Sequence, residues 1–481
     1  MLFNSTAFLF FLPAVFLLYW FVCNRSVFSQ NILILVASYF FYGWWSWKFM
    51  GLLLLSTVMD YVYGFGVASA NQRKARFFLW LSIINNLGIL ALFKYYDFFA
   101  SSLQHGLQQL GIQADMPLLN LALPIGISFY TFHGMSYVFD IYRKKQVPVS
   151  GFTDYAVFVS FFPLLVAGPI ERAHHLLPQV QRGRQFSYSQ AVSGCRLMLW
   201  GLFKKVVIAD NLGGIADIAF EQYNAFNGIS LLIGVVAFAF QIYGDFSGYS
   251  DMALGIARLF GFELLSNFRF PYFSRNLGEF WRRWHISLSG WFRDYLYIPL
   301  GGSRRGSLIT WRNTLVVFLV SGLWHGASWN FIVWGGLHAA GFLMLMVLPG
   351  KASDYNDVVA AKSRFPMFGE LTGMLFTFSF VAFAWVFFRA PDLAVAVDYL
   401  ENMLRSLLLN PEANLHQIYG KSALLYILPL VMADWYFRHD ERELKVPGKS
   451  RWVRWLFYAL LIFLIGMFKY ADSSRFIYFQ F

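Results

Sequence analysis

Long apolar runs recur along this chain and are separated by short polar segments. The first three occupy residues 6–22, 31–45 and 49–70. A helix needs about 20 apolar residues to cross a hydrocarbon core of about 30 Å, so each of these runs is close to spanning length. The pattern therefore predicts an all-α, polytopic membrane protein.

The composition supports this class. Hydrophobic residues make up 58% and charged residues only 13% of the chain, whereas soluble domains are usually about 25% charged. The formal net charge of +12 is the excess expected of cytoplasmic loops in a membrane protein, so we expect the lipid bilayer and no nucleic acid as a partner. Two cysteines next to or within apolar runs provide no disulfide framework.

The remaining runs indicate about eleven to thirteen helices in a single integral membrane domain over residues 1–481. The segment 155–168 is short for a span and contains Pro163, which favours a re-entrant or broken helix. Basic loops after the runs 49–70 and 121–141 belong in the cytoplasm by the positive-inside rule. Met1 then lies on the periplasmic side.

The segment 265–338 combines two kinds of sequence. Its first half is rich in arginine and tryptophan, and its second half is an apolar run that contains His325. His325 follows Arg312 by thirteen residues, which corresponds to about 20 Å along a helix. An ionisable side chain at that depth is costly and is a functional candidate, and a neutral imidazole can accept a proton from a hydroxyl group. The alternative is a structural histidine bonded to a neighbouring carbonyl.

Other polar residues have more ordinary interpretations beside the functional ones. His285 lies among tryptophans and arginines, where a histidine stacked on an aromatic ring is an equal alternative to a functional one. His338 is expected to pack between helices. Asp245 and Asp251 need partners in near-membrane sequence, and we expect arginines of the 265–312 segment to pair with them.

Several enzyme classes lack their motifs here. There is no nucleophile elbow, no phosphate-binding P-loop and no dinucleotide fingerprint in a suitable context. No two histidines have the i, i+4 spacing with a carboxylate that metal sites use, so we predict no metal site and no bound cofactor.

Six stretches carry a resemblance to a known family. They read LPIGISFYTF (123–132), FFPLLVAGPIER (161–172), GLFKKVVIADN (201–211), QIYGDFSGYSDMALG (241–255), NFRFPYFSRNLGEFWRRWHISLSGWFRDYLYIPLGG (267–302) and GLWHGASWNFIVWGGLH (322–338). The chain resembles the membrane-bound O-acyltransferase family, in its bacterial branch that O-acetylates alginate. The last two stretches are highly specific.

The resemblance implies a fold, a site and a reaction. The family's catalytic histidine, in its WHG motif, falls on His325, and its second histidine falls on His285. The fold would be a ring-like helical bundle with a cytoplasmic funnel in the bacterial inner membrane. An acyl group would come from a cytoplasmic thioester such as acetyl-CoA and leave for an alginate-like exported polysaccharide, directly or through a periplasmic acyltransferase or esterase-like partner.

The two lines of reasoning combine into one expected mechanism. His325 acts as the general base toward an acceptor hydroxyl, while backbone N–H groups or Asn330 stabilise the oxyanion. His285 assists on the donor side or at the thin central partition where the funnel ends. Arg282, Arg283 and Arg293 are candidates to bind the donor phosphates, because guanidinium groups match phosphate geometry.

Other functions remain open on the sequence alone. Within the same chemistry, the acyl group can be D-alanine for teichoic acid, or the acceptor can be peptidoglycan. A non-catalytic transporter, or a scaffold of a polysaccharide export complex, would have a similar composition.

Overall fold

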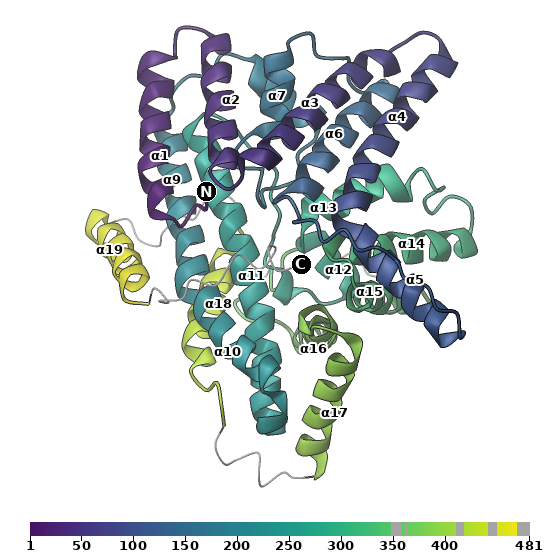
Figure 1. The fold of residues 1–481 in the computed structure, drawn as a ribbon. Coiled ribbons are helices and arrows are strands. Elements are labelled where there is room, and N and C mark those ends of the chain that lie inside the picture. The colour runs from purple at the N-terminus through teal and green to yellow at the C-terminus, as the bar shows by residue number, and fades with distance from the viewer. Residues whose placement is uncertain (348–356, 362, 410–417, 441–449, 469–481) are drawn as a thin grey trace. The chain divides into compact units, whose positions relative to one another are not determined.

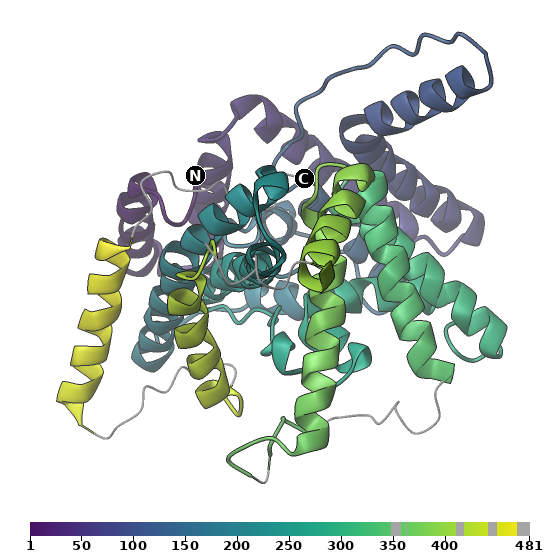
Figure 2. The same cartoon turned by 90° about the horizontal axis from the view of Figure 1, so that it is seen from below.

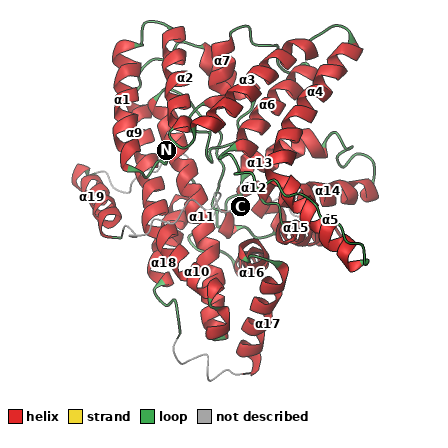
Figure 3. Ribbon diagram, in the orientation of Figure 1, coloured by secondary structure: helices red, strands yellow, loops and turns green. Residues whose placement is uncertain are grey.

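The structure is a computed structural model that describes residues 1–347, 357–361, 363–409, 418–440 and 450–468. Within these residues every regular element is a helix (Figure 3). The predicted all-α fold class is confirmed. The described part contains nineteen α-helices, more than the sequence suggested, because several apolar runs are followed or interrupted by short helices of less than spanning length.

The chain forms two compact units, which we describe separately. The first consists of residues 1–195 and 253–265. Its helices in chain order (Figure 1) are α1 (Thr6–Leu17), α2 (Val27–Gly43), α3 (Trp47–Val67), α4 (Gln72–Leu90), α5 (Tyr96–Gln109), α6 (Ile127–Tyr142), α7 (Phe152–Ser160), α8 (Ala173–Gln181) and the first half of α9 (Tyr188–Phe203).

The second unit consists of residues 196–252 and 266–481. Its elements are the π-helix η3 (Lys204–Ala209), α10 (Asp210–Glu221), most of α11 (Gly228–Leu259), α12 (Leu277–Arg283), α13 (Ile286–Phe292), the π-helix η6 (Arg293–Tyr297), α14 (Ser307–His325), α15 (Trp329–Val347), α16 (Phe368–Arg389), α17 (Leu393–Leu409), α18 (Ala423–Phe437) and α19 (Arg451–Met467).

Six helical segments in the described residues are long and apolar enough to cross a membrane. They are α3, the continuous segment from α4 to α5, α11, α14, α15 and α16. The multi-span character expected from the sequence is therefore confirmed. The ring-like arrangement and the cytoplasmic funnel stay predictions.

Helix α11 differs from the sequence-based expectation. The hydropathy pattern divides this region into two apolar runs, 228–243 and about 250–262, and so predicts two helices, but one helix of 32 residues covers Gly228–Leu259. The polar stretch between the runs stays helical because its aspartates pair with lysines inside the second unit. A helix can carry charge through an apolar interior when each charge has a partner.

The break predicted around Pro163 lies in the first unit. Helix α7 ends at Ser160, and a buried irregular segment leads to α8. The carboxylate of Glu171 accepts a hydrogen bond from the Leu265 N–H at 2.6 Å, and the Glu171 N–H donates to Nε2 of His133 at 3.1 Å. Irregular backbone is tolerated in such an interior because protein groups satisfy it.

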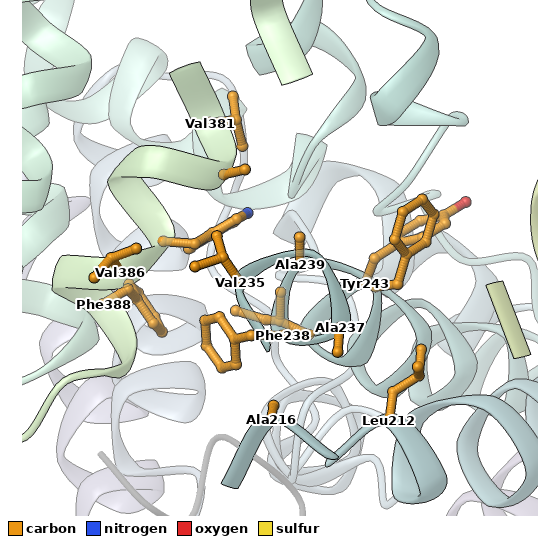
Figure 4. Packing of buried hydrophobic residues seen from close by; sticks show 14 of the residues in the cluster. Leu212, Ala216, Val235, Ala237, Phe238, Ala239, Tyr243, Val381, Val386 and Phe388 are labelled. Carbon is orange, nitrogen blue, oxygen red and sulfur yellow. The ribbon is translucent and has the colours of Figure 1, made fainter. Parts of the chain in front are cut away.

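The core of the second unit is built largely from α10, α11 and α16 (Figure 4). Phe238 of α11 and Trp385 of α16 are almost fully buried in it. Phe388, at the C-terminal end of α16, belongs to the same cluster. The core therefore extends directly to the residues around His325, which Phe388 contacts.

Helices α14 and α15 form a close antiparallel pair (Figure 1 and Figure 2). A Cβ atom added at Gly322 would lie 2.1 Å from the carbonyl oxygen of Phe331, and one at Gly335 would lie 2.3 Å from that of Phe318. Small residues at a helix interface let two backbones approach in this way. Gly336 is different, because its added Cβ would meet only a leucine methyl group at 3.9 Å.

Substituting these neighbouring glycines should have opposite consequences. Gly335→Ala pushes a methyl group into the backbone of α14, and we expect it to lower the unfolding free energy by about 1–3 kcal/mol. Gly336→Ala should leave stability unchanged or raise it slightly. Thermal melts of both variants in the same detergent measure this, and equal melting temperatures would contradict the close approach.

Candidate functional site

His325 is the last residue of α14. Its side chain is 6% exposed and lies in a wall of aromatic rings. The ring centroids of Trp324, Trp334 and Phe388 lie 5.0, 5.1 and 5.3 Å from that of His325. Gly326 ends the helix, and α15 starts at Trp329. The imidazole is thus held at the turn between two closely packed helices, as expected for a buried functional histidine.

His285 occupies a strained position before α13. It is the N-cap residue of that helix, its φ is +43°, and its side chain is 1% exposed. The loop is fixed by Asn267, whose carbonyl oxygen accepts from the Ile286 N–H and whose side chain accepts from the Ser287 hydroxyl. A left-handed conformation in a residue other than glycine costs energy and often marks a functional position.

The two histidines lie together although they are far apart in sequence. Their ring centroids are 6.4 Å apart, with the Trp324 indole in contact with both rings. Among the described residues, neither ring nitrogen of His285 has a hydrogen-bond partner. A substrate group in contact with one imidazole is therefore within reach of the other.

Burial sets the charge state of His285. Because desolvation disfavours the imidazolium form, the pKa of His285 falls from 6.5 to about 3. His285 is consequently neutral at physiological pH. A neutral imidazole carries one N–H donor and one acceptor nitrogen, so it suits hydrogen bonding to a substrate rather than ion pairing.

Asn330 is buried near the start of α15. Its side-chain nitrogen donates to the carbonyl oxygen of Ala390 at 2.7 Å, which ties α15 to the end of α16. Its side-chain oxygen is buried without a hydrogen-bond partner in the described part of the chain. The side-chain atom of Asn330 that has no partner is therefore the oxygen, a hydrogen-bond acceptor. An oxyanion needs a donor instead.

The three candidate arginines lie in different environments. Arg282 and Arg293 are exposed, and Arg293 forms an ion pair with Asp294 at 2.9 Å. Arg283 instead bonds to the buried carboxylate of Glu279, which also binds Arg275. Arg283 thus stabilises α12, and its charge is largely compensated.

The partners of the two α11 aspartates differ from the expected ones. Lys204 binds Asp251 at 2.8 Å and the Ser247 hydroxyl at 2.9 Å, and Lys205 binds Asp245 at 2.9 Å. Lysines of η3 therefore bind both aspartates, where arginines of the 265–312 segment were expected. These lysines were missed, although the pair stands out in the apolar stretch GLFKKVVIADN.

Both lysines lie in the interior because every residue of the π-helix η3 is buried. Lys204 and Lys205 are each 4% exposed, and Lys205 also binds Asp210 at 2.8 Å. Phe246 lies between Asp245 and Asp251 in the sequence of α11, and its ring centroid is 4.6 Å from that of His285. The ion pairs and this contact therefore fix the rotation of α11 against the site. No group of three or more histidines, cysteines and carboxylates suited to a metal ion occurs in the described residues.

Comparison with known proteins identifies the class. The sequence profile of the membrane-bound O-acyltransferase family matches residues 39–351. The chain belongs to this family and is a membrane O-acyltransferase.

Similar proteins within the family act on bacterial polymers, according to their names. The chain is 38% identical to the probable alginate O-acetylase AlgI of Pseudomonas putida over the full length of both proteins. It is 35% identical to the peptidoglycan O-acetyltransferase of Helicobacter pylori, over 100% of this chain and 98% of that one. It is 30% identical to the teichoic acid D-alanyltransferase of Streptococcus thermophilus, over 48% of this chain and 58% of that one.

Removing the cation of Lys205 should destabilise the protein strongly. Lys205→Met leaves Asp210 and Asp245 buried without their shared lysine, and breaking a buried pair in this way costs about 3–5 kcal/mol. The exposed residue Lys421 provides the control, since Lys421→Met should be almost neutral. Denaturation in one detergent compares them, and equal stabilities would refute the role of the ion pairs.

The charge state of His285 predicts a pH effect on stability. Below pH 6.5 the imidazole is protonated in the unfolded chain, while in the folded protein it stays neutral down to about pH 3. Proton uptake therefore favours unfolding, by up to about 1.4 kcal/mol per pH unit. We expect wild type to lose stability relative to His285→Gln between pH 6.5 and 4.

Thermal melts of both proteins from pH 8 to pH 4 measure this difference. His105 is exposed on α5, so His105→Gln should show no comparable change relative to wild type. A difference between wild type and His285→Gln that does not vary with pH would contradict a buried, neutral His285.

Proposed function

We propose that this protein transfers an acetyl group from acetyl-CoA, a cytoplasmic thioester, to hydroxyl groups of an alginate-like exported polysaccharide. The observation that supports this most directly is the pair of buried histidines, whose ring centroids lie 6.4 Å apart. His285 precedes α13, and His325 ends α14. The two relatives matched over nearly their whole lengths are named for the O-acetylation of polymers. The D-alanyltransferase matches only about half of the chain.

The reaction needs one base and one stabiliser of negative charge. His325 accepts the proton of the acceptor hydroxyl as the oxygen attacks the thioester carbonyl. The C–O bond forms, the C–S bond breaks, and His325 returns the proton to the leaving thiolate. The products are the ester and the free thiol, and no proton is gained or lost overall.

His285 is suited to the stabilising role. It is neutral, it is buried, and its ring nitrogens are not used by other described residues. Its N–H can donate to the carbonyl oxygen of the thioester, where negative charge develops. The Asn330 nitrogen already donates to Ala390 and the unbonded Asn330 oxygen is an acceptor, so we assign the oxyanion to His285 and backbone N–H groups first. Asn330 comes second, through the other hydrogen of its amide group.

The donor phosphates need exposed cations. Arg282 and Arg293 are exposed near the same short helices as His285, and the ion pair of Arg293 with Asp294 is at the surface, whereas Arg283 is bound to the buried carboxylate of Glu279. We therefore assign phosphate binding to Arg282 and Arg293 and a structural role to Arg283. Arginine is suited to this because its planar fork matches phosphate oxygens.

The proposal includes the membrane in which the protein lies and the direction of transfer. The protein lies in the bacterial inner membrane with Met1 on the periplasmic side, as its basic loops indicate. The acetyl group crosses the membrane at the site and is passed to the polymer directly or by a periplasmic acyltransferase or esterase-like partner. Transport or scaffolding without covalent chemistry is the competing function.

The decisive variant is His325→Ala. We expect it to reduce acetyl transfer by a factor of about 100 to 10,000, the range supplied by a general acid–base residue. Membrane vesicles that contain the protein are given radiolabelled acetyl-CoA on the cytoplasmic face. Free thiol and label in the polymer fraction are then measured, with a polysaccharide acceptor and periplasmic extract present.

His105→Ala is the matched control, because His105 is an exposed histidine of α5 in the other unit. It should transfer acetyl groups at the wild-type rate. If His325→Ala remains folded and releases thiol as fast as wild type, the catalytic assignment is wrong. If wild type itself transfers no label, transport or scaffolding becomes the better explanation.

A further inference from the structure

A third histidine, His338, is separated from His325 by the Trp334 ring and has no role in the reaction as proposed above. His338 of α15 is fully buried. Five aromatic rings contact its imidazole, with centroid separations of 4.9–6.3 Å. They belong to Phe280, Trp281, Phe318, Trp334 and Phe380. The sequence suggested only that this residue packs between helices, which its burial confirms.

The polar atoms of this cluster are unusual. Neither ring nitrogen of His338 has a hydrogen-bond partner among the described residues, and the same holds for the indole nitrogens of Trp281 and Trp334. All four atoms are buried. Each unsatisfied group costs about 1–3 kcal/mol, so a purely structural position of this shape would favour phenylalanine. Such groups call for an internal water molecule or a functional explanation.

The three rings carry the donors and the acceptor that one internal water molecule needs. The centroids of Trp281 and Trp334 lie 5.0 and 4.9 Å from that of His338, and the two indoles lie 5.9 Å apart. Two indole N–H groups can donate to one water oxygen, and that water can donate to the acceptor nitrogen of a neutral imidazole. A buried water typically makes about three hydrogen bonds of this kind.

Trp334 joins this cluster to the catalytic histidine. Its centroid lies 5.1 Å from that of His325 and 4.9 Å from that of His338, so the indole lies in contact with both imidazoles. When His325 accepts a proton it becomes a cation, and an aromatic ring within about 6 Å can stabilise a cation. The orientation of the Trp334 indole therefore matters to the reaction.

We infer that His338 is a positioning residue of the acyl-transfer site. Together with the indole N–H groups of Trp281 and Trp334 it holds an internal water molecule, and this fixes the indole of Trp334 against His325. The inference rests on the proposed function, since it assigns His338 a role in that reaction. It differs from a packing role, which requires no polar atom.

His338→Phe separates the two roles. Phenylalanine fills a similar volume in an aromatic cage and removes the buried polar atoms, so the melting temperature should stay the same or rise. The turnover number should fall about tenfold, the effect of losing a desolvated cation–π contact, while KM for acetyl-CoA stays unchanged. His338→Gln keeps a donor and an acceptor, and it should recover part of the lost turnover.

His133→Phe is the matched control, because this buried histidine of α6 accepts a hydrogen bond from the Glu171 N–H at 3.1 Å. It should lower the melting temperature and leave the turnover of the folded protein unchanged. A His338→Phe variant that is stable and fully active would overturn the inference. So would a variant that loses stability and activity together and is not improved by glutamine.

A second measurement keeps the inference separate from the proposed function. A high-resolution cryo-electron microscopy map of wild type should show water density between His338, Trp281 and Trp334, and the map of His338→Phe should not. If wild type shows no acetyl transfer but the water is present, the proposed function fails and the water site stands. A wild-type map without that density refutes the water site.

Discussion

Polar groups in the apolar interior of this protein must find partners within the protein, because a bilayer supplies none. Lys204 and Lys205 show how the second unit meets this requirement. Each is buried and bonded to a carboxylate of α11, and Lys205 reaches α10 as well. The pairs permit one long helix where the hydropathy pattern suggested two. They also set its rotation, which places Phe246 against His285.

The surroundings of the histidines are among the places where the described residues depart from this rule. His285 and His338 keep buried ring nitrogens that no described residue satisfies, and so does the indole of Trp334. Natural proteins satisfy nearly all buried polar groups, and the exceptions concentrate at functional sites. Burying a polar group away from water costs free energy, and the ion pairs of α11 and the unsatisfied rings near His325 are two different responses to that cost. The first stabilises the fold, and the second leaves hydrogen-bonding capacity for substrate and water.

The sequence predicts the parts of this structure that depend on composition and periodicity. The all-helical fold, the broken segment after α7 and the burial of His325 follow from apolar runs and their interruptions. The partners of Asp245 do not, because arginine and lysine are equally plausible cations until the register of η3 is known. The left-handed backbone of His285 has no local signal either, since neither glycine nor asparagine stands there. The family resemblance pointed to His285 without explaining how it is held.

The helix ends give the two catalytic candidates different electrostatic settings. His325 is the last residue of a 19-residue helix, where the helix dipole favours positive charge. His285 precedes the N-terminus of α13, where the dipole disfavours positive charge, and burial lowers the pKa of its imidazole. A base must become cationic during the reaction, whereas a hydrogen-bond donor to an oxyanion works best when it stays neutral and does not lose its proton. The backbone therefore favours His325 as the base and His285 as the neutral donor, and exchanging the two roles would place a cation at the wrong helix end.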